Sequence, residues 1–217
     1  MALNFIDYLV NSCTTYCSYD YYLLPLINEE GYGYAKTTDS SWVKTREDVG
    51  SGCKGVNLLE NFDHGDFPAG DSYACSDRYQ GASVMSSPST AYQVAKAAVN
   101  HIKFTLTLTK NGNKLSYPPA HTTTNKNDAG GIMTRYLEEY RNAAASSTSA
   151  AAYTVGSYAA NHGVNHGHPL DFNDKEYGHS FNIALDGDET MIVAKTEEFI
   201  AGVHAMIGYA RTQQGFP

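Results

Sequence analysis

Three histidines lie close together in the sequence NHGVNHGHP, which covers residues 161–169. His162, His166 and His168 are separated by three residues and by one residue, and imidazoles at such short spacings can converge on a metal ion such as zinc. The glycines between them indicate instead a polar loop with turns. We therefore expect a loop here and keep the three histidines as weak candidates for a metal site.

Two further polar clusters contain residue types that bind cations. His64 lies near Asp63 and Asp66, and we expect this cluster to be part of a surface loop. The acidic sequence DGDET covers residues 186–190, but a calcium site needs more oxygen ligands in a defined pattern, so we expect a turn with solvated carboxylates. The sequence contains no phosphate-binding glycine motif and no G-x-S-x-G nucleophile motif.

The chain has four cysteines, Cys13, Cys17, Cys53 and Cys75. Zinc-ribbon sites need two close cysteine pairs, and only Cys13 and Cys17 are close. The longer separation of Cys53 and Cys75 favours a loop-closing disulfide, which implies an extracellular or secretory compartment. Cys13 and Cys17 can form a second disulfide, remain buried thiols or link two chains. The N-terminal residues do not resemble a signal peptide, so this localisation rests on the disulfide.

Composition excludes several classes of protein. The net charge is −8 and the pI about 5.4, whereas a nucleic-acid-binding protein normally has a basic face. No apolar stretch approaches the length of a membrane span, so we expect no membrane insertion. The 17 tyrosines outnumber the 15 lysines and arginines, and tyrosine is enriched at protein interfaces, so we expect other protein chains as partners. The length of 217 residues suits one domain, residues 1–217.

Hydrophobic periodicity predicts the elements that must position these residues. Helices are predicted for residues 2–11, 88–102, 132–146 and 194–211. Strands are predicted for residues 20–27, 55–58, 104–109 and 179–185. Loops are predicted for residues 28–54, 60–83, 110–128 and 161–168. Strands that alternate with helices indicate a layered α/β fold.

Five segments follow one another in the order of a known family. They cover residues 23–46, 52–63, 75–99, 153–157 and 179–185, and include GCKGVNLLENFD and HSFNIAL. These segments resemble the zinc carboxypeptidases of the carboxypeptidase A type. The resemblance implies a mixed, mainly parallel twisted sheet flanked by helices, and it supports the Cys53–Cys75 disulfide. The chain would lack the opening strands of the family domain, as if truncated on its N-terminal side.

The resemblance also implies how family positions are occupied here. The family binds zinc through His, Glu and His, and the H-x-x-E sequence that supplies the first two is absent from this chain. The second histidine position falls on Thr109, and the glutamate general base falls on Ala184. The Asn-Arg pair that binds the substrate carboxylate falls on Leu59 and Glu60.

Two more family positions differ. The oxyanion-stabilising arginine falls on Val43, which has no side-chain donor, and the substrate-capping tyrosine falls approximately on Gly163. The sequence therefore predicts an inactive protein without a zinc cofactor, a catalytically degenerate homologue.

Four functional hypotheses follow. The favoured one is a structural, self-assembling extracellular protein, a homo-oligomer or filament, because missing strands would leave a sheet edge free to pair with another chain. The alternative is a monomeric or dimeric module that binds a peptide or protein in the old substrate groove without turnover. A further alternative is a fragment of an active zinc carboxypeptidase, and a new zinc or hydrolytic site is the remaining one.

Overall fold

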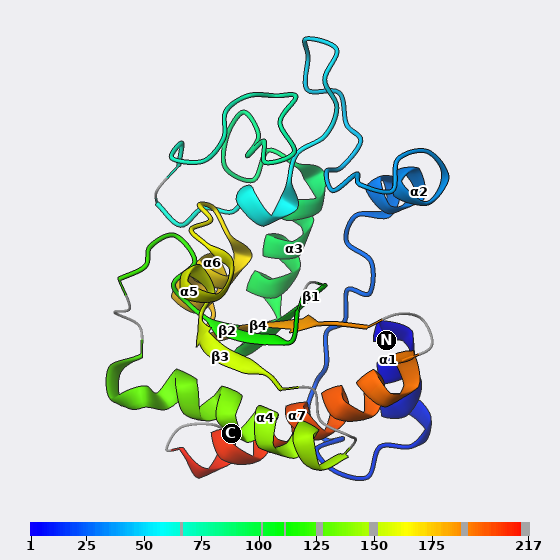
Figure 1. The fold of residues 1–217 in the computed structure, drawn as a ribbon, viewed down its shortest axis with the longest axis vertical. Helices are drawn as coiled ribbons and strands as arrows, with labels where there is room; N and C mark the ends of the chain where they lie inside the picture. Colours follow the sequence, from blue (N-terminus) through cyan, green and yellow to red (C-terminus); the bar gives the residue numbers. More distant parts are fainter. Residues whose placement is uncertain are drawn as a thin grey trace.

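The computed structural model describes residues 1–65, 67–100, 102–110, 112–124, 128–147, 152–187 and 191–213 (Figure 1). The first half contains α1 (Ala2–Asn11), α2 (Glu29–Thr37), the 3₁₀ helix η1 (Leu58–Glu60), α3 (Pro88–Val99) and β1 (Phe104–Lys110). The second half contains β2 (Lys114–Tyr117), the 3₁₀ turn η2 (Ala129–Gly131), α4 (Ile132–Ser147), β3 (Thr154–Ser157), α5 (Tyr158–His162), α6 (Pro169–Glu176), β4 (His179–Leu185) and α7 (Ile192–Thr212). No helix in these described ranges is long and apolar enough to cross a membrane.

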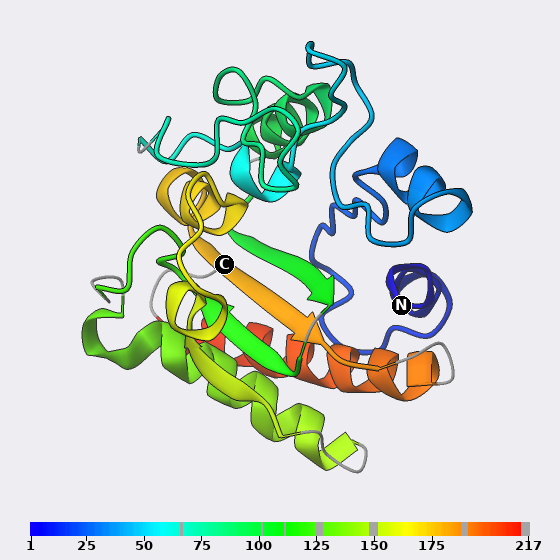
Figure 2. The same ribbon diagram turned by 45° about the horizontal axis from the view of Figure 1, so that its top comes forward.

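The described strands form one sheet in the order β1-β4-β2-β3. β1 is parallel to β4 and β2 is parallel to β3, while β2 and β4 are antiparallel. Helices α4 and α7 cover one face of the sheet, and α3, α5 and α6 lie on the other side (Figures 1 and 2). This confirms the predicted mixed, mainly parallel sheet with helices on both faces.

The main core lies between the sheet and helices α4 and α7. Its fully buried side chains include Leu115, Tyr136, Leu137, Tyr140, Phe181, Ile183 and Met206. Burial of a Leu, Ile or Met side chain contributes about 1.5–3 kcal/mol each, so this layer dominates the stability of the fold. Helices α4 and α7 approach closely at Gly202, where an added Cβ would lie 2.3 Å from the Tyr140 ring.

The strongly periodic segments form the elements that the sequence predicts. The predicted helices at 2–11, 88–102, 132–146 and 194–211 match α1, α3, α4 and α7 to within three residues at each end, and the predicted strands at 104–109 and 179–185 match β1 and β4 to within one. Pro88 begins α3 at its first position, where its missing N–H costs no helical hydrogen bond. β1 and β4 are the strands with period-two or nearly continuous apolar sequence.

Two predicted strands are wrong. Residues 20–27 form an extended loop without a strand partner, and the large side chains of this segment, Tyr22, Leu23, Leu24, Leu26 and Ile27, are 37–53% exposed. Pro25, in the middle of this segment, has no N–H to donate to a ladder. Residues 55–58 approach the backbone of Thr45, which only a glycine at position 55 permits, and the chain then turns into η1.

Besides the 3₁₀ helices, five short elements were not predicted: α2, β2, β3, α5 and α6. Helix α2 begins after Asn28, whose side chain accepts a hydrogen bond from the N–H of Gly31, in a region predicted as loop. β2 occupies part of the predicted loop 110–128, and α5 and α6 surround the histidine-rich segment. Part of the acidic sequence 186–190 lies outside the described residues.

Both cysteine pairs form disulfides. The predicted Cys53–Cys75 bond is confirmed, and Cys13 and Cys17 also bond to each other, which settles the alternatives left open for them. The Cys53–Cys75 bond closes the long loop that contains η1. Two disulfides are typical of proteins that fold in the secretory pathway.

Candidate functional site

The C-terminal ends of β1 and β4 place Thr109 and Ala184 side by side. The two residues are Cα partners in the parallel ladder. The amide of Asn182 donates to the Thr109 hydroxyl at 3.1 Å, and Ala184 is fully buried. A cavity of about 270 Å³ lies beside these strand ends, and its lining includes Thr109, Lys110, Asp186 and Lys195.

Glu60 ends the short helix η1 and is buried, with 2% of its side chain exposed. Its Oε1 accepts a hydrogen bond from Arg78 Nε at 2.7 Å, and Arg78 also donates to the carbonyl of Val164 at 3.4 Å. Burial raises the pKa of Glu60, while the Arg78 guanidinium acts in the opposite direction. This ion pair therefore connects η1, the Cys75 loop and the histidine-rich loop.

The two remaining positions that the resemblance assigns to substrate binding and catalysis hold the uncharged residues Val43 and Gly163. Val43 is exposed in the segment after α2, and Gly163 ends α5 with a φ of 88°, a left-handed conformation that suits glycine. Neither offers a side-chain hydrogen-bond donor.

The three histidines of the histidine-rich loop have separate structural roles. His168 is fully buried, and its Nδ1 accepts a hydrogen bond from the N–H of Leu170 as the cap of α6. Its ring packs on Tyr158 at 4.1 Å, and His162 stacks on Tyr158 at 4.4 Å. Burial lowers the pKa of His168 to about 3 and also lowers the pKa of His162. Together with His166 they do not form a three-ligand group, since the described residues contain one such group and it lies elsewhere.

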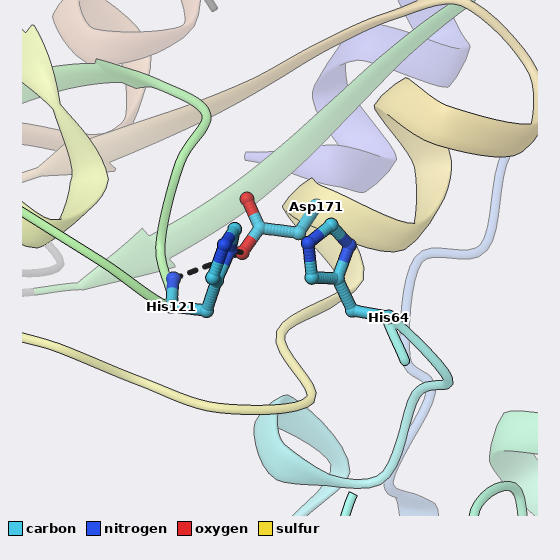
Figure 3. Close-up of side chains that lie close together, drawn as sticks. All are labelled: His64, His121 and Asp171. Atoms are coloured by element: carbon cyan, nitrogen blue, oxygen red, sulfur yellow. Dashed lines mark hydrogen bonds and ion pairs between the residues drawn. The ribbon is translucent and has the colours of Figure 1, made fainter. Parts of the chain in front are cut away.

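That group consists of His64, His121 and Asp171 (Figure 3). One potential ligand atom from each lies within 4.8 Å of the others. The Asp171 carboxylate accepts hydrogen bonds from the backbone N–H of Ala120 at 2.8 Å and of His121 at 2.9 Å, and its Oδ2 lies 2.7 Å from His121 Nδ1. The His64 and His121 rings are 4.2 Å apart.

Three elements that are distant in the sequence bring this group together. His121 follows β2, and Asp171 lies in the first turn of α6, which Pro169 begins. His64 follows η1, and the N–H of Phe62 donates to the carbonyl of Gly167 at 2.9 Å, which holds the two loops together.

The sequence did not predict this arrangement. His64 was expected on a surface loop with Asp63 and Asp66, but it is partly buried against the ring of His121. Asp66 lies outside the described residues. His121 and Asp171 are 50 residues apart and carry no local motif, so only the fold reveals their contact. The sequence HPLD, with proline at the helix start, was the one local indication that Asp171 begins a helix.

A comparison with protein families decides the identity of this fold. The family model described as zinc carboxypeptidase matches residues 1–207. The chain belongs to the zinc carboxypeptidase family.

Curated members of this family match parts of the chain. Carboxypeptidase B from Bos taurus is 39% identical over 104 residues, which cover 46% of this chain and 25% of that protein. Carboxypeptidase A2 from Rattus norvegicus is 40% identical over 87 residues, which cover 39% of this chain and 19% of that protein. The matched regions thus span a quarter or less of these relatives.

Solved structures share the fold over almost the whole chain. Bovine thrombin-activatable fibrinolysis inhibitor, solved in complex with tick carboxypeptidase inhibitor, matches with a TM-score of 0.87 and 21% identity, covering 98% of this chain and 77% of that one. Carboxypeptidase A from Helicoverpa armigera matches with a TM-score of 0.82 and 21% identity, covering 97% and 57%.

A zinc carboxypeptidase is expected to hold zinc near the end of the strand that carries Thr109. The cavity there is lined by Thr109, Asp186, Lys110 and Lys195 together with apolar residues, and the Lys195 amine is held by the Glu198 carboxylate at 2.8 Å. Structural and catalytic zinc sites are built from imidazole, thiolate and carboxylate ligands. Asp186 is the one ligand of these types among the described residues of the lining, so the cavity does not fit a zinc ion.

Proposed function

We propose that this zinc carboxypeptidase family member associates with other protein chains and does not cleave peptide bonds. The register pair Thr109–Ala184 carries the proposal. The resemblance assigns a zinc ligand and the general base to these two positions. A threonine hydroxyl is a poor zinc ligand beside imidazole, and an alanine methyl group cannot take a proton from water.

The ion pair between the buried Glu60 and the exposed Arg78 supports the same conclusion. Glu60 occupies the position assigned to the arginine that binds the substrate carboxylate, so its negative charge would repel that group. Its partner Arg78 donates from Nε to Glu60 and from Nη2 to the carbonyl of Val164, so part of its charge is directed toward Glu60. The Val43 side chain cannot donate a hydrogen bond to a developing oxyanion.

The surface of the fold supports association with protein chains. β1 forms one margin of the sheet and pairs only with β4 among the described strands, so we assign the pairing with another chain to its outer side (Figure 2). The segment between α1 and α2 presents the exposed apolar side chains of residues 22–27. A second copy of the chain is the favoured partner, in an oligomer or filament of the extracellular space, where the two disulfides are stable.

A second candidate function is peptide binding without turnover. The cavity beside Thr109 favours it, because its lining combines apolar residues with Asp186 and Lys110. In this case the protein would be a monomer or dimer that binds a peptide in solution.

Zinc-dependent hydrolysis tests the catalytic half of the proposal. Purified protein with added zinc is incubated with a blocked dipeptide that ends in an aromatic or aliphatic residue, and we expect no release of free amino acid. The variant Thr109→Phe, purified in the same way, controls for contaminating peptidases because its ring enters the cavity. Zinc-dependent release by the unmodified protein that is lost in Thr109→Phe would contradict the proposal.

A further inference from the structure

We propose that His64, His121 and Asp171 form a zinc site that lies apart from the cavity beside Thr109. The three residues come from the loop after η1, the segment after β2 and the first turn of α6. An ion held by all three would therefore join three segments of the chain at one point. This inference does not depend on the proposed function.

The geometry needs only small adjustments to bind an ion. Two ligand atoms of a tetrahedral zinc ion lie about 3.4 Å apart, given bonds of about 2.0–2.1 Å. The three ligand atoms already lie within 4.8 Å of one another. His64 and His121 are only partly buried, so their side chains can rotate to the distances that an ion requires. The ion would replace the present 2.7 Å contact between His121 Nδ1 and Asp171 Oδ2.

The carboxylate of Asp171 is already held in place. Its side chain is 1% exposed, and the backbone N–H groups of Ala120 and His121 fix its orientation. Among the described residues, Oδ1 accepts a hydrogen bond from the N–H of Ala120, so it has a second lone pair for a metal ion. Ligands held by neighbouring groups in this way lose little freedom when the ion binds.

The two imidazoles point to the class of metal. His64 Nδ1 is buried and has no hydrogen-bond partner among the described residues, a state that costs free energy and that a metal bond would relieve. Two imidazoles and one carboxylate are ligands that zinc prefers, and a water molecule can complete a tetrahedron. Calcium and magnesium prefer sites made of oxygen atoms, so they suit this group poorly.

Zinc titration of the full chain tests the site. Metal-free protein is titrated with zinc chloride against a chromophoric chelator, and we expect one tight site per chain. His64→Ala and His121→Ala should each weaken zinc binding by at least about tenfold. His166→Ala is the matched control, because it removes a partly buried histidine from the neighbouring loop, and it should leave the affinity unchanged.

Circular dichroism separates loss of ligand from loss of fold. Asp171→Asn is a weaker test, since Asp171 also supports the backbone at Ala120 and His121. Among the described residues, the His64 side chain has no hydrogen bond to the backbone of this kind. A folded His64→Ala variant therefore tests whether His64 binds the metal ion. Absence of tight zinc binding overturns the proposal, and so does a site that survives in folded His64→Ala or is lost in His166→Ala.

Discussion

His168 is a buried histidine whose environment excludes its charged form. It is fully buried, caps α6 through Nδ1 and packs on Tyr158. Its burial lowers its pKa to about 3, whereas an unfolded histidine titrates near 6.5. Between these values the unfolded chain binds one proton more than the folded chain. The free energy of unfolding therefore falls as the pH drops below about 6.5, and His168 has no effect above it.

We predict that His168→Asn reduces this pH dependence. Asparagine can still cap the helix, but it does not titrate. Between pH 6 and pH 5 the free energy of unfolding, measured with urea, should fall more steeply for the wild-type protein than for the variant. The expected difference is about 1.4 kcal/mol per pH unit. Asp174 acts in the opposite direction, because burial raises its pKa to about 6, but it is present in both proteins and cancels from the difference. Parallel pH profiles for the two proteins would refute the role given to His168.

At the scale of elements, the sequence predicts structure well where neighbouring residues decide it. Helices α1, α3, α4 and α7 have regular apolar spacing, and β1 alternates strictly, so local pattern and final structure agree. Residues 20–27 show the limit of this approach. Their apolar, aromatic composition favours a strand, but a strand needs a neighbour to pair with, and the described chain provides none.

The candidate sites show the same limit. The resemblance located Thr109 and Ala184, and the ladder register places them together. The cluster of His64, His121 and Asp171 depends on contacts between distant segments, which no single stretch of sequence reveals. The histidine-rich loop attracted attention through its spacing, yet the cap of α6 and the packing on Tyr158 decide the roles of its side chains.

The crossing of α4 and α7 offers a test of packing. Gly202 faces the ring of Tyr140, and an added Cβ would lie 2.3 Å from it, too close without movement of the helices. We predict that Gly202→Ala lowers the free energy of unfolding by about 1–3 kcal/mol, despite the better helix propensity of alanine. Gly208→Ala in the same helix is the control, because its Cβ would meet only the Tyr16 hydroxyl, at 2.9 Å. Equal stability of the two variants in urea unfolding would show that this crossing tolerates a larger side chain.

At the scale of the whole molecule, the tyrosines divide between the buried core and the surface. The sequence suggested a tyrosine-rich interaction surface, but Tyr79, Tyr117, Tyr136, Tyr140, Tyr153 and Tyr158 are buried and build the interior. Tyr22, Tyr32, Tyr73 and Tyr92 are exposed, and the segment of residues 22–27 between α1 and α2 carries a run of exposed large side chains. A partner chain that covers this segment would remove these side chains from water, and one that pairs with β1 would extend the sheet.

Native mass spectrometry of the purified protein tests most directly whether its chains associate with one another. The account predicts assemblies larger than a dimer of the 23.6 kDa chain. Leu24→Lys should shift them toward the monomer, because a charge on this exposed residue opposes its burial, whereas Val193→Lys, at an exposed position of α7, should not. A monomer at every concentration examined, or an assembly unaffected by Leu24→Lys, would contradict the account.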